Sequence, residues 1–592
     1  MDNWLNILLI LTVMLPVAGA LLVWLLGWSG RTDIRPLALA VSLVTLGLTG
    51  WIISCYPGGG KELAVSNFSW LGGPDSIVNI RFSLGLDGLG LWLFGLSSLL
   101  TLTAILVSWE AITERRTAFF GLLLLLETGM LGVFTARDII LFYIFFEFTL
   151  IPLFFLIGIW GSEDRRYAAV KFFVFTLAGS LLTFLSLLAI VLWNYTATGQ
   201  MTFMIGELVA GLQQHPMDAS LQLWVFLGLF AGFAIKVPLF PLHTWLPLAH
   251  TQAPTAGSVI LAGILLKIGT YGFLRFSLPM LPDGTAVCTP WILWLSVIGI
   301  IYGALVALVQ TDFKRLIAYS SVSHLGFCML GIFALNSLGM EGGTLQMINH
   351  GLSTGGLFAC VGMIYERYHT RQISEFGGLA RRLPFLAFFT LVFTFSSIGL
   401  PGMNGFAGEF LLLAGMFQRG WSESPEQLGT QFMWIAVLAV SGVVLGAWYM
   451  LYMIQRIFFG PLKEPEVHLD HGHHDHGPAS PAGTTAHGTS AHDSHAHDTH
   501  GHGAIATLPP GVPDLKLREF FALAPLVVFV FWIGLYPEFF LRSIRPNVVD
   551  LFPPAARDLY KNYGDPIKRP YVEPLDEAIA NAGPAHSKEA AQ

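Results

Sequence analysis

The sequence predicts an all-α polytopic membrane protein with about fourteen transmembrane helices. Three observations support this class. Of the 592 residues, 54% are hydrophobic and only 12% are charged, apolar segments of spanning length recur along the chain, and the charge of the connections alternates. No basic stripe suggests a nucleic-acid partner, so we expect none and expect lipid to surround the chain instead.

The predicted helices follow from the length that a bilayer demands. A hydrocarbon core about 30 Å thick needs roughly 20 apolar residues per helix. The first segment lacks the basic region and cleavage site of a signal peptide, so we expect it to be a helix of the protein. The predicted spans are 4–26, 36–56, 84–108, 117–135, 138–158, 170–193, 220–248, 255–277, 290–309, 314–335, 343–366, 384–417, 431–459 and 519–541.

Charged residues in the connections predict the orientation of these helices. Most Lys and Arg follow helices 1, 3, 5, 9, 11 and 13, in runs such as "RTDIR", "EDRR" and "DFKR", whereas the connections after helices 6 and 10 hold none. Because cytoplasmic loops carry an excess of Lys and Arg, we expect both termini in the periplasm of a bacterial inner membrane. The seven Lys and Arg residues of the C-terminal tail weigh against this orientation.

Two predicted helices, 220–248 and 384–417, contain helix breakers. In the first, "IKVPLFPLHTWLP" places prolines after Lys236, and in the second, "GLPGMNGFAGEF" places Gly and Pro ahead of Glu409. Because proline removes a backbone donor, a broken membrane helix persists only where the freed groups are buried in protein or line a cavity. The breaks therefore predict transport sites.

The two breaks also predict an internal repeat. Helices 4 to 8 and helices 9 to 13 contain the same odd number of spans, with Lys236 and Glu409 at equivalent places, so the second unit is expected to be inverted relative to the first. The expected divisions are residues 1–116 for the first three helices, 117–277 and 290–460 for the two repeats, 461–515 for a cytoplasmic loop, and 516–592 for the last helix and a polar tail.

The loop between helices 13 and 14 has an unusual composition. Residues 468–502 are rich in Gly, Ser, Thr, Asp and His, a composition that cannot bury a core and that predicts a solvated, disordered insertion. Metal binding is the alternative, because clustered imidazoles bind zinc, nickel or copper. The candidate ligands are His471, His473, His474 and His476.

Four ionisable residues are predicted to lie within the membrane: Glu147, Lys236, Lys267 and Glu409. A charge at the centre of a membrane helix costs roughly 3 kcal/mol, so such residues usually face a partner or a hydrated path. A Glu147 and Lys236 pair would act as a switch, because each favours the charged form of the other when they are close. The alternative for the two lysines is that their side chains extend to the membrane interface, although Arg275 is the better candidate for that position. The alternative for the two glutamates is that they cap a helix or contact a neighbouring helix.

Histidines form a second group of candidates. His324 and His350 suit a secondary relay, because imidazole titrates near neutrality and can donate and accept at once, although a structural hydrogen bond is the alternative for each. The weaker candidates are His243, His250, Glu110 and Glu127. No CxxC or CxxCH motif is present, so we expect no haem, iron-sulfur cluster or other cofactor in this chain.

Three motifs carry a family resemblance: "FAIKVPLFPLHTWLPLAHTQAPTAGSVILAGILLKIGTYG", "RLIAYSSVSHLGF" and "LPGMNGFAGEF". They resemble the proton-translocating membrane subunits of respiratory complex I, which are related to Mrp-type cation/proton antiporters. The similarity covers about residues 80 to 460. Glu409 is typical of the M-type group, because the sister chains and the antiporters are expected to carry a lysine there.

The resemblance implies a translocase subunit without a redox centre, driven by quinone reduction elsewhere in the complex. Its implied partners are the other membrane subunits, especially the L and N chains. The implied roles are a Glu147 and Lys236 pair, a central Lys267, a bridge of histidines, and Glu409 as the terminal site. The alternatives are a Na⁺/proton antiporter subunit, the equivalent subunit of a membrane-bound hydrogenase, formate-linked or ferredoxin-driven complex, and an inactive scaffold.

Overall fold

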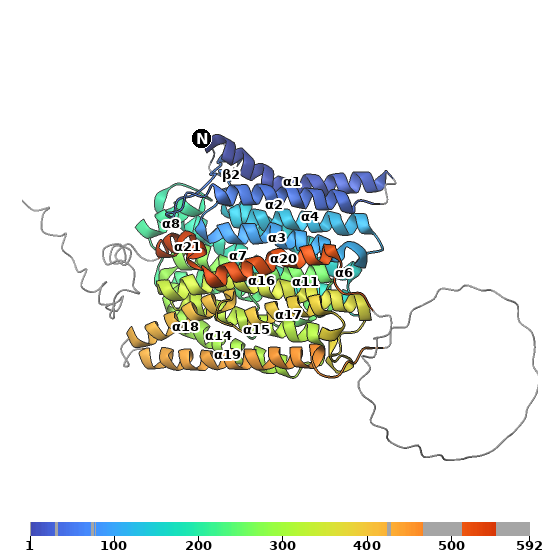
Figure 1. Cartoon of the computed structure of the whole chain (residues 1–592). Helices are drawn as coiled ribbons and strands as arrows, with labels where there is room; N and C mark the ends of the chain where they lie inside the picture. The colour runs from blue at the N-terminus through green and yellow to red at the C-terminus, as the bar shows by residue number, and fades with distance from the viewer. Residues whose placement is uncertain are drawn as a thin grey trace, which may run out of the picture.

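The helices of the computed structural model lie side by side with roughly parallel axes. α1 (Asp2–Trp28) is at one edge of the bundle and α19 (Gly429–Phe458) is at the opposite edge (Figure 1). The structure describes residues 2–29, 33–72, 76, 78–422, 428–465 and 512–551. The predicted His-rich loop, with its candidate ligands His471, His473, His474 and His476, lies outside the described residues, as does the tail after residue 551.

The order of elements follows the predicted spans. The first part of the chain forms α2 (Arg35–Ser54), β1 (Phe68–Leu71), β2 (Ile80–Phe82), α3 (Gly88–Ala111), α4 (Arg116–Thr135), α5 (Ile139–Phe148), α6 (Leu150–Trp160), α7 (Arg165–Thr198), α8 (Ile205–Gln214), α9 (Ala219–Lys236) and α10 (Trp245–Gln252). Predicted helix 8 contains two π-helical segments and forms α11 (Thr255–Ile260), η1 (Leu261–Leu265), α12 (Leu266–Gly272), η2 (Phe273–Ser277) and α13 (Leu278–Met280). The remaining elements are α14 (Pro282–Leu308), α15 (Phe313–Phe333), α16 (Ser337–Tyr368), the 3₁₀ turns η3 (Ile373–Glu375) and η4 (Leu379–Arg381), α17 (Pro384–Ser397), α18 (Asn404–Ser422), α20 (Leu517–Leu535) and α21 (Glu538–Val549).

The predicted all-α polytopic class is confirmed. Within the described residues, 13 helices are long and apolar enough to cross a membrane. The remaining predicted span is interrupted, as the glycines and proline indicated: α17 has only 14 residues, and α18 resumes after residue 403. Helix ends were less accurate. For example, α14 begins at Pro282 rather than at residue 290, because proline suits the first turn of a helix.

Besides the two 3₁₀ turns, three elements outside the spans were not predicted: the β1–β2 hairpin, α8 and α21. Each follows an even-numbered predicted span, and all three lie at the same end of the bundle (Figure 1). In the hairpin, Phe68 pairs with Phe82 in antiparallel register. Strands of four and three residues are too short to stand out in a hydropathy pattern, which explains the omission.

The centre of the bundle consists of the helix from Thr255 to Met280 together with α15 and α16. The most apolar 18-residue windows of these three helices are 100%, 94% and 100% buried, compared with 39% for α1, α19 and α20. The peripheral helices expose large hydrophobic side chains, as expected for a surface that meets lipid or neighbouring subunits. The central helices carry Lys267, His324 and His350.

Candidate functional site

Lys267 lies at the centre of the bundle on α12 and is completely buried. Its Nζ donates a hydrogen bond to the Ala262 carbonyl, which belongs to the preceding π-helical segment, and lies 2.6 Å from His350 Nδ1. Irregular segments of this kind are rare in helices and are frequent at functional sites. The helix is therefore irregular where it presents its lysine to a neighbouring helix.

Two histidines extend the row of titratable groups that begins at Lys267. The rings of His350 on α16 and His324 on α15 lie 5.7 Å apart between centroids, with planes tilted by 56°. The Nε2 atoms of both rings are buried and have no hydrogen-bond partner among the described residues. A buried polar atom without a hydrogen-bond partner lowers stability by about 1–3 kcal/mol. Water molecules that bridge the two rings would satisfy both nitrogens.

Glu409 on α18 completes the series. Its Oε1 lies 3.5 Å from His324 Nδ1 and accepts a hydrogen bond of 3.1 Å from Gln346 Nε2. The carboxylate also lies against the break between α17 and α18, where a Cβ on Gly399 would come within 2.6 Å of Glu409 Oε2. Gly399 has φ +71°, a conformation that favours glycine, so the break and the approach of the carboxylate depend on the same residue.

Amide side chains hold this end of the series in place. Asn349 Nδ2 donates to Gln346 Oε1 and to the Asn404 carbonyl, at 3.1 and 2.7 Å. Asn404 Oδ1 accepts a hydrogen bond of 2.5 Å from Ser396 Oγ across the break. The network joins α16 to both halves of the interrupted helix and thereby positions the amide that binds Glu409.

The predicted partners Glu147 and Lys236 are neighbours without an ion pair. Lys236 is the last residue of α9 and is 4% exposed, and its Nζ lies 4.9 Å from the centre of the Phe146 ring. Glu147 is partly exposed near the junction of α5 and α6, and the charges of the two residues act on each other. Among the described residues, no nitrogen–oxygen contact within 4 Å joins them. The cation thus faces an aromatic ring in this state.

The segment that carries Glu147 is anchored by Asp138. This residue precedes α5, and its Oδ1 accepts hydrogen bonds from the N–H groups of Ile140 and Leu141, at 2.8 and 3.3 Å. Its Oδ2 accepts from the Arg81 N–H of β2 at 3.0 Å. Burial raises the pKa of the Asp138 carboxyl to about 6. The cap therefore ties the outer hairpin to the helix that holds Glu147.

The packing of α9 on α12 brings the two lysine-bearing segments together. A Cβ on Gly269 would come within 2.7 Å of the Phe233 carbonyl oxygen and 2.9 Å of the Val237 nitrogen. The two backbones therefore touch one turn from Lys236 and Lys267. No residue larger than glycine fits this contact without a shift.

Two basic residues make contacts that the sequence did not predict. Arg275, expected at the membrane interface, has a side chain that is 13% exposed, and its Nη2 pairs with Asp87 Oδ2 at 2.6 Å. Lys314 was counted only as a loop charge, yet it is 6% exposed and its Nζ donates to the Ala253 carbonyl at 2.6 Å. Local sequence contains no signal for either contact, because the partner lies on another helix in both cases.

Comparisons with known proteins assign the family. The family model described as "NADH:quinone oxidoreductase/Mrp antiporter, TM" matches residues 136–424. NADH-quinone oxidoreductase subunit M of Rhodobacter capsulatus is 37% identical over 566 residues, which cover 94% of this chain and 97% of that protein. The chain belongs to the subunit M family of NADH-quinone oxidoreductases.

Other relatives agree with this assignment to the subunit M family. NADH-ubiquinone oxidoreductase chain 4 of Chondrus crispus is 38% identical over 547 residues, covering 92% of this chain and 97% of the relative. The solved structure of respiratory complex I from Thermus thermophilus with bound NADH contains a chain with 32% identity and a TM-score of 0.74, and the match covers 92% of this chain and 98% of that one. The predicted family is thus confirmed.

Proposed function

We propose that this chain carries protons across the membrane as the M-type subunit of NADH-quinone oxidoreductase. The observation that carries the proposal is the buried line from Lys267 through His350 and His324 to Glu409, in which each group lies next to the following one. Buried titratable groups at this density are costly in a membrane and mark ion paths. In this scheme Glu147 and Lys236 feed the line.

The chemistry requires only proton transfer between neighbouring groups. An imidazole can accept a proton on one nitrogen and release another from its second nitrogen, and a lysine amine accepts and releases on one atom. Moving one charge against 100 mV requires about 2.3 kcal/mol, which modest changes in the environment of these groups can supply. Redox chemistry is assigned to other subunits, and this chain is proposed to hold no cofactor.

The proposed setting is the inner membrane of a bacterium, with both termini in the periplasm. The alternation of charged connections supports this orientation, and the odd-numbered connections would then face the cytoplasm. The proposed neighbours are the L and N chains and membrane lipid, for which the exposed apolar faces of the peripheral helices are suitable. The inverted repeats 117–277 and 290–460 remain part of the proposal, supported by the two interrupted helices.

A second candidate function is Na⁺/proton exchange, because the matching family model also includes Mrp antiporters. Glu409 favours proton transport, because the antiporters that the chain resembles are expected to carry a lysine at this position. Transport that follows the Na⁺ gradient and not the pH gradient would support exchange instead.

The test is Lys267→Ala in the complete complex, with Lys61→Ala as a control because Lys61 is exposed. Quinone reductase activity and proton translocation are measured together in membrane vesicles, after assembly of the subunit is verified. We expect translocation to fall about tenfold or more in Lys267→Ala, the scale on which a positioned proton-transfer group contributes, and to be retained in Lys61→Ala. Normal translocation by assembled Lys267→Ala would overturn the proposal.

A further inference from the structure

α17, the first half of the interrupted helix, begins without a polar residue at its cap position. Leu383 precedes the helix and Pro384 is its first residue. A leucine side chain cannot accept a hydrogen bond, and the first N–H groups of a helix have no partner within it. The N–H groups of Phe385 and Leu386 therefore require an acceptor from outside α17.

Asp514 supplies this acceptor from the segment that precedes α20. Its Oδ2 accepts a hydrogen bond from the Phe385 N–H at 2.7 Å, and its Oδ1 accepts one from the Leu386 N–H at 3.2 Å. A carboxylate at this place satisfies two backbone donors and also meets the positive end of the helix dipole. The residue that caps α17 thus lies 128 positions after Leu386 in the chain.

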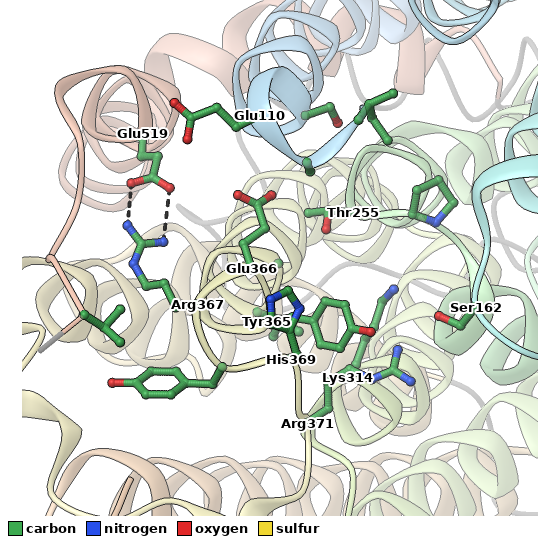
Figure 2. A pocket seen from close by; sticks show the side chains of 18 of the residues that line it. Glu110, Ser162, Thr255, Lys314, Tyr365, Glu366, Arg367, His369, Arg371 and Glu519 are labelled. Atoms are coloured by element: carbon green, nitrogen blue, oxygen red, sulfur yellow. Dashed lines mark hydrogen bonds and ion pairs between the residues drawn. The ribbon is translucent and has the colours of Figure 1, made fainter. Parts of the chain in front are cut away.

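A buried arginine holds Asp514 in this position. Arg367, in the last turn of α16, binds both carboxylate oxygens of Glu519 on α20, at 3.1 and 2.7 Å, in the wall of a cavity of about 960 Å³ (Figure 2). Its Nε and Nη2 also donate to the carbonyls of Pro513 and Asp514, at 3.0 and 3.2 Å. Because a bidentate pair fixes the orientation of both partners, the start of α20 is bound to α16 and α17 together.

α20 then packs along α17 and reaches the break that follows it. Near the start of the two helices, the rings of Phe389 and Phe520 meet edge to face with centroids 5.4 Å apart. At the far end of α20, a Cβ on Gly534 would come within 2.5 Å of Met403 Cα. The 14 residues of α17 span about 21 Å at 1.5 Å per residue. α20 therefore contacts this half-helix near its start and the break beyond its end.

The break in turn determines where Glu409 lies. The Met403 N–H donates to the Leu400 carbonyl at 3.1 Å, and the next residue, Asn404, begins α18. Glu409 follows in the second turn of α18, and its carboxylate lies against Gly399. A shift of Met403 would move the first turns of α18 and the carboxylate with them.

We propose that α20 and residues 512–516 before it form a strut that positions the Glu409 carboxylate. Asp514 and Gly534 are the positioning residues at its two ends. Asp514 fixes the start of α17, and the close approach of Gly534 to Met403 fixes the break. The strut thereby keeps Glu409 Oε1 at its distance of 3.5 Å from His324 Nδ1. The inference rests on the proposed function, because Glu409 must itself carry protons.

The first test compares Gly534→Ala with Gly50→Ala in the assembled complex. Both add one methyl group to a membrane helix, but a Cβ at Gly50 would meet no atom of the described residues within 4 Å. We expect Gly50→Ala to translocate protons normally and Gly534→Ala to lower translocation about tenfold, because a misplacement of about 1 Å can cost roughly a hundredfold. Equal translocation by the two assembled variants would overturn the proposal.

A double variant separates positioning from a general loss of stability. Gly534→Ala is combined with Glu409→Asp, whose shorter side chain already withdraws the carboxylate from His324. Residues that act through a shared contact are not independent, so we expect the effect of Gly534→Ala to differ by at least about twofold between the two backgrounds. The same factor in both backgrounds would show that α20 acts elsewhere, and the proposal would fail.

The other end of the strut is tested with Asp514→Ala and Asp514→Asn. We expect Asp514→Ala to lower translocation about tenfold, and Asp514→Asn to lower it less because the amide keeps one oxygen for the N–H groups of α17. The matched control is Asp218→Ala, since Asp218 precedes α9 but its side chain accepts no capping hydrogen bond from the described residues. These variants are also combined with Glu409→Asp, and they decide alone if Gly534→Ala does not assemble. Normal translocation in Asp514→Ala would remove Asp514 from the strut.

The outcomes separate this inference from the proposed function. Loss in Lys267→Ala together with normal translocation in Gly534→Ala and Asp514→Ala would overturn the strut and leave the central line intact. Normal translocation in Lys267→Ala would overturn the proposed function and the strut with it.

Discussion

Lys267 Nζ and His350 Nδ1 lie 2.6 Å apart, although 83 positions separate them in the chain. A protonated lysine and a doubly protonated histidine are both donors only, so a contact this short requires that one of the two nitrogens act as acceptor. One nitrogen of the pair therefore donates a hydrogen bond and the other accepts it. A buried hydrogen-bonded pair of this kind is suited to receive a proton on one side and to release it on the other.

The two histidines should behave as consecutive members of one path. We expect His350→Ala and His324→Ala each to lower proton translocation about tenfold or more, and the double variant to be no slower than the worse single variant, because residues that act as a unit are not additive. Translocation and quinone reduction are measured in the assembled complex. A double variant with the product of the two defects would indicate separate paths.

Lys236 should be required even though it forms no ion pair in this structure. Lys236→Ala removes the only cation at the end of α9, and we expect loss of translocation on the scale of a proton-transfer group, about tenfold or more. Phe146→Leu, which removes the ring under the ammonium but no titratable group, is the matched control and should have a smaller effect. Equal defects would mean that the cation acts only through its contact with the ring.

Glu409 should contribute to transport by binding and releasing a proton, and not by the size of its side chain. Glu409→Gln preserves size and can still accept from Gln346, but it cannot titrate, so we expect translocation to fall about tenfold or more. Glu409→Asp keeps the carboxyl group and should retain more activity. The measurement is the number of protons moved for each quinone reduced. A Gln variant as active as the wild type would exclude Glu409 from the path.

The contact between Gly399 and Glu409 allows the position of the Glu409 carboxylate to be tested without removing a titratable group. Gly399→Ala adds a Cβ 2.6 Å from Glu409 Oε2, and Gly402→Ala adds one with nothing within 4 Å. Both glycines have positive φ, +71° and +89°, so both substitutions introduce backbone strain of about 1–2 kcal/mol. We expect Gly399→Ala to impair translocation more than Gly402→Ala at equal assembly. Equal effects would show that strain, and not the displaced carboxylate, is responsible.

The His-rich connection should be dispensable for transport. Deletion of residues 468–502 removes a segment whose composition predicts a solvated insertion, so we expect translocation and quinone reduction to remain close to wild type. Both are measured with and without added zinc or nickel. Loss of activity that an added metal restores would assign the segment a metal-dependent role instead.

Much of the membrane architecture followed from local sequence. Lys236 was expected to end the first half of an interrupted helix, and α9 ends at that residue, because the prolines that follow cannot continue a helix. The β1–β2 hairpin and α8 were missed because their apolar runs are shorter than a span. His250 was ranked as a weak candidate, since only the fold reveals that both of its ring nitrogens are buried without a hydrogen-bond partner among the described residues.

The sequence by itself determined the membrane class, the spans and the two interruptions, because a bilayer imposes length and hydropathy on each segment separately. Only the tertiary structure decided which ionisable groups meet. The rotation and packing of the helices place His350 against Lys267 and His324 against Glu409, keep Glu147 out of direct contact with Lys236, and bury Lys314 beside α10. These contacts join helices far apart in the chain, and no local pattern specifies them.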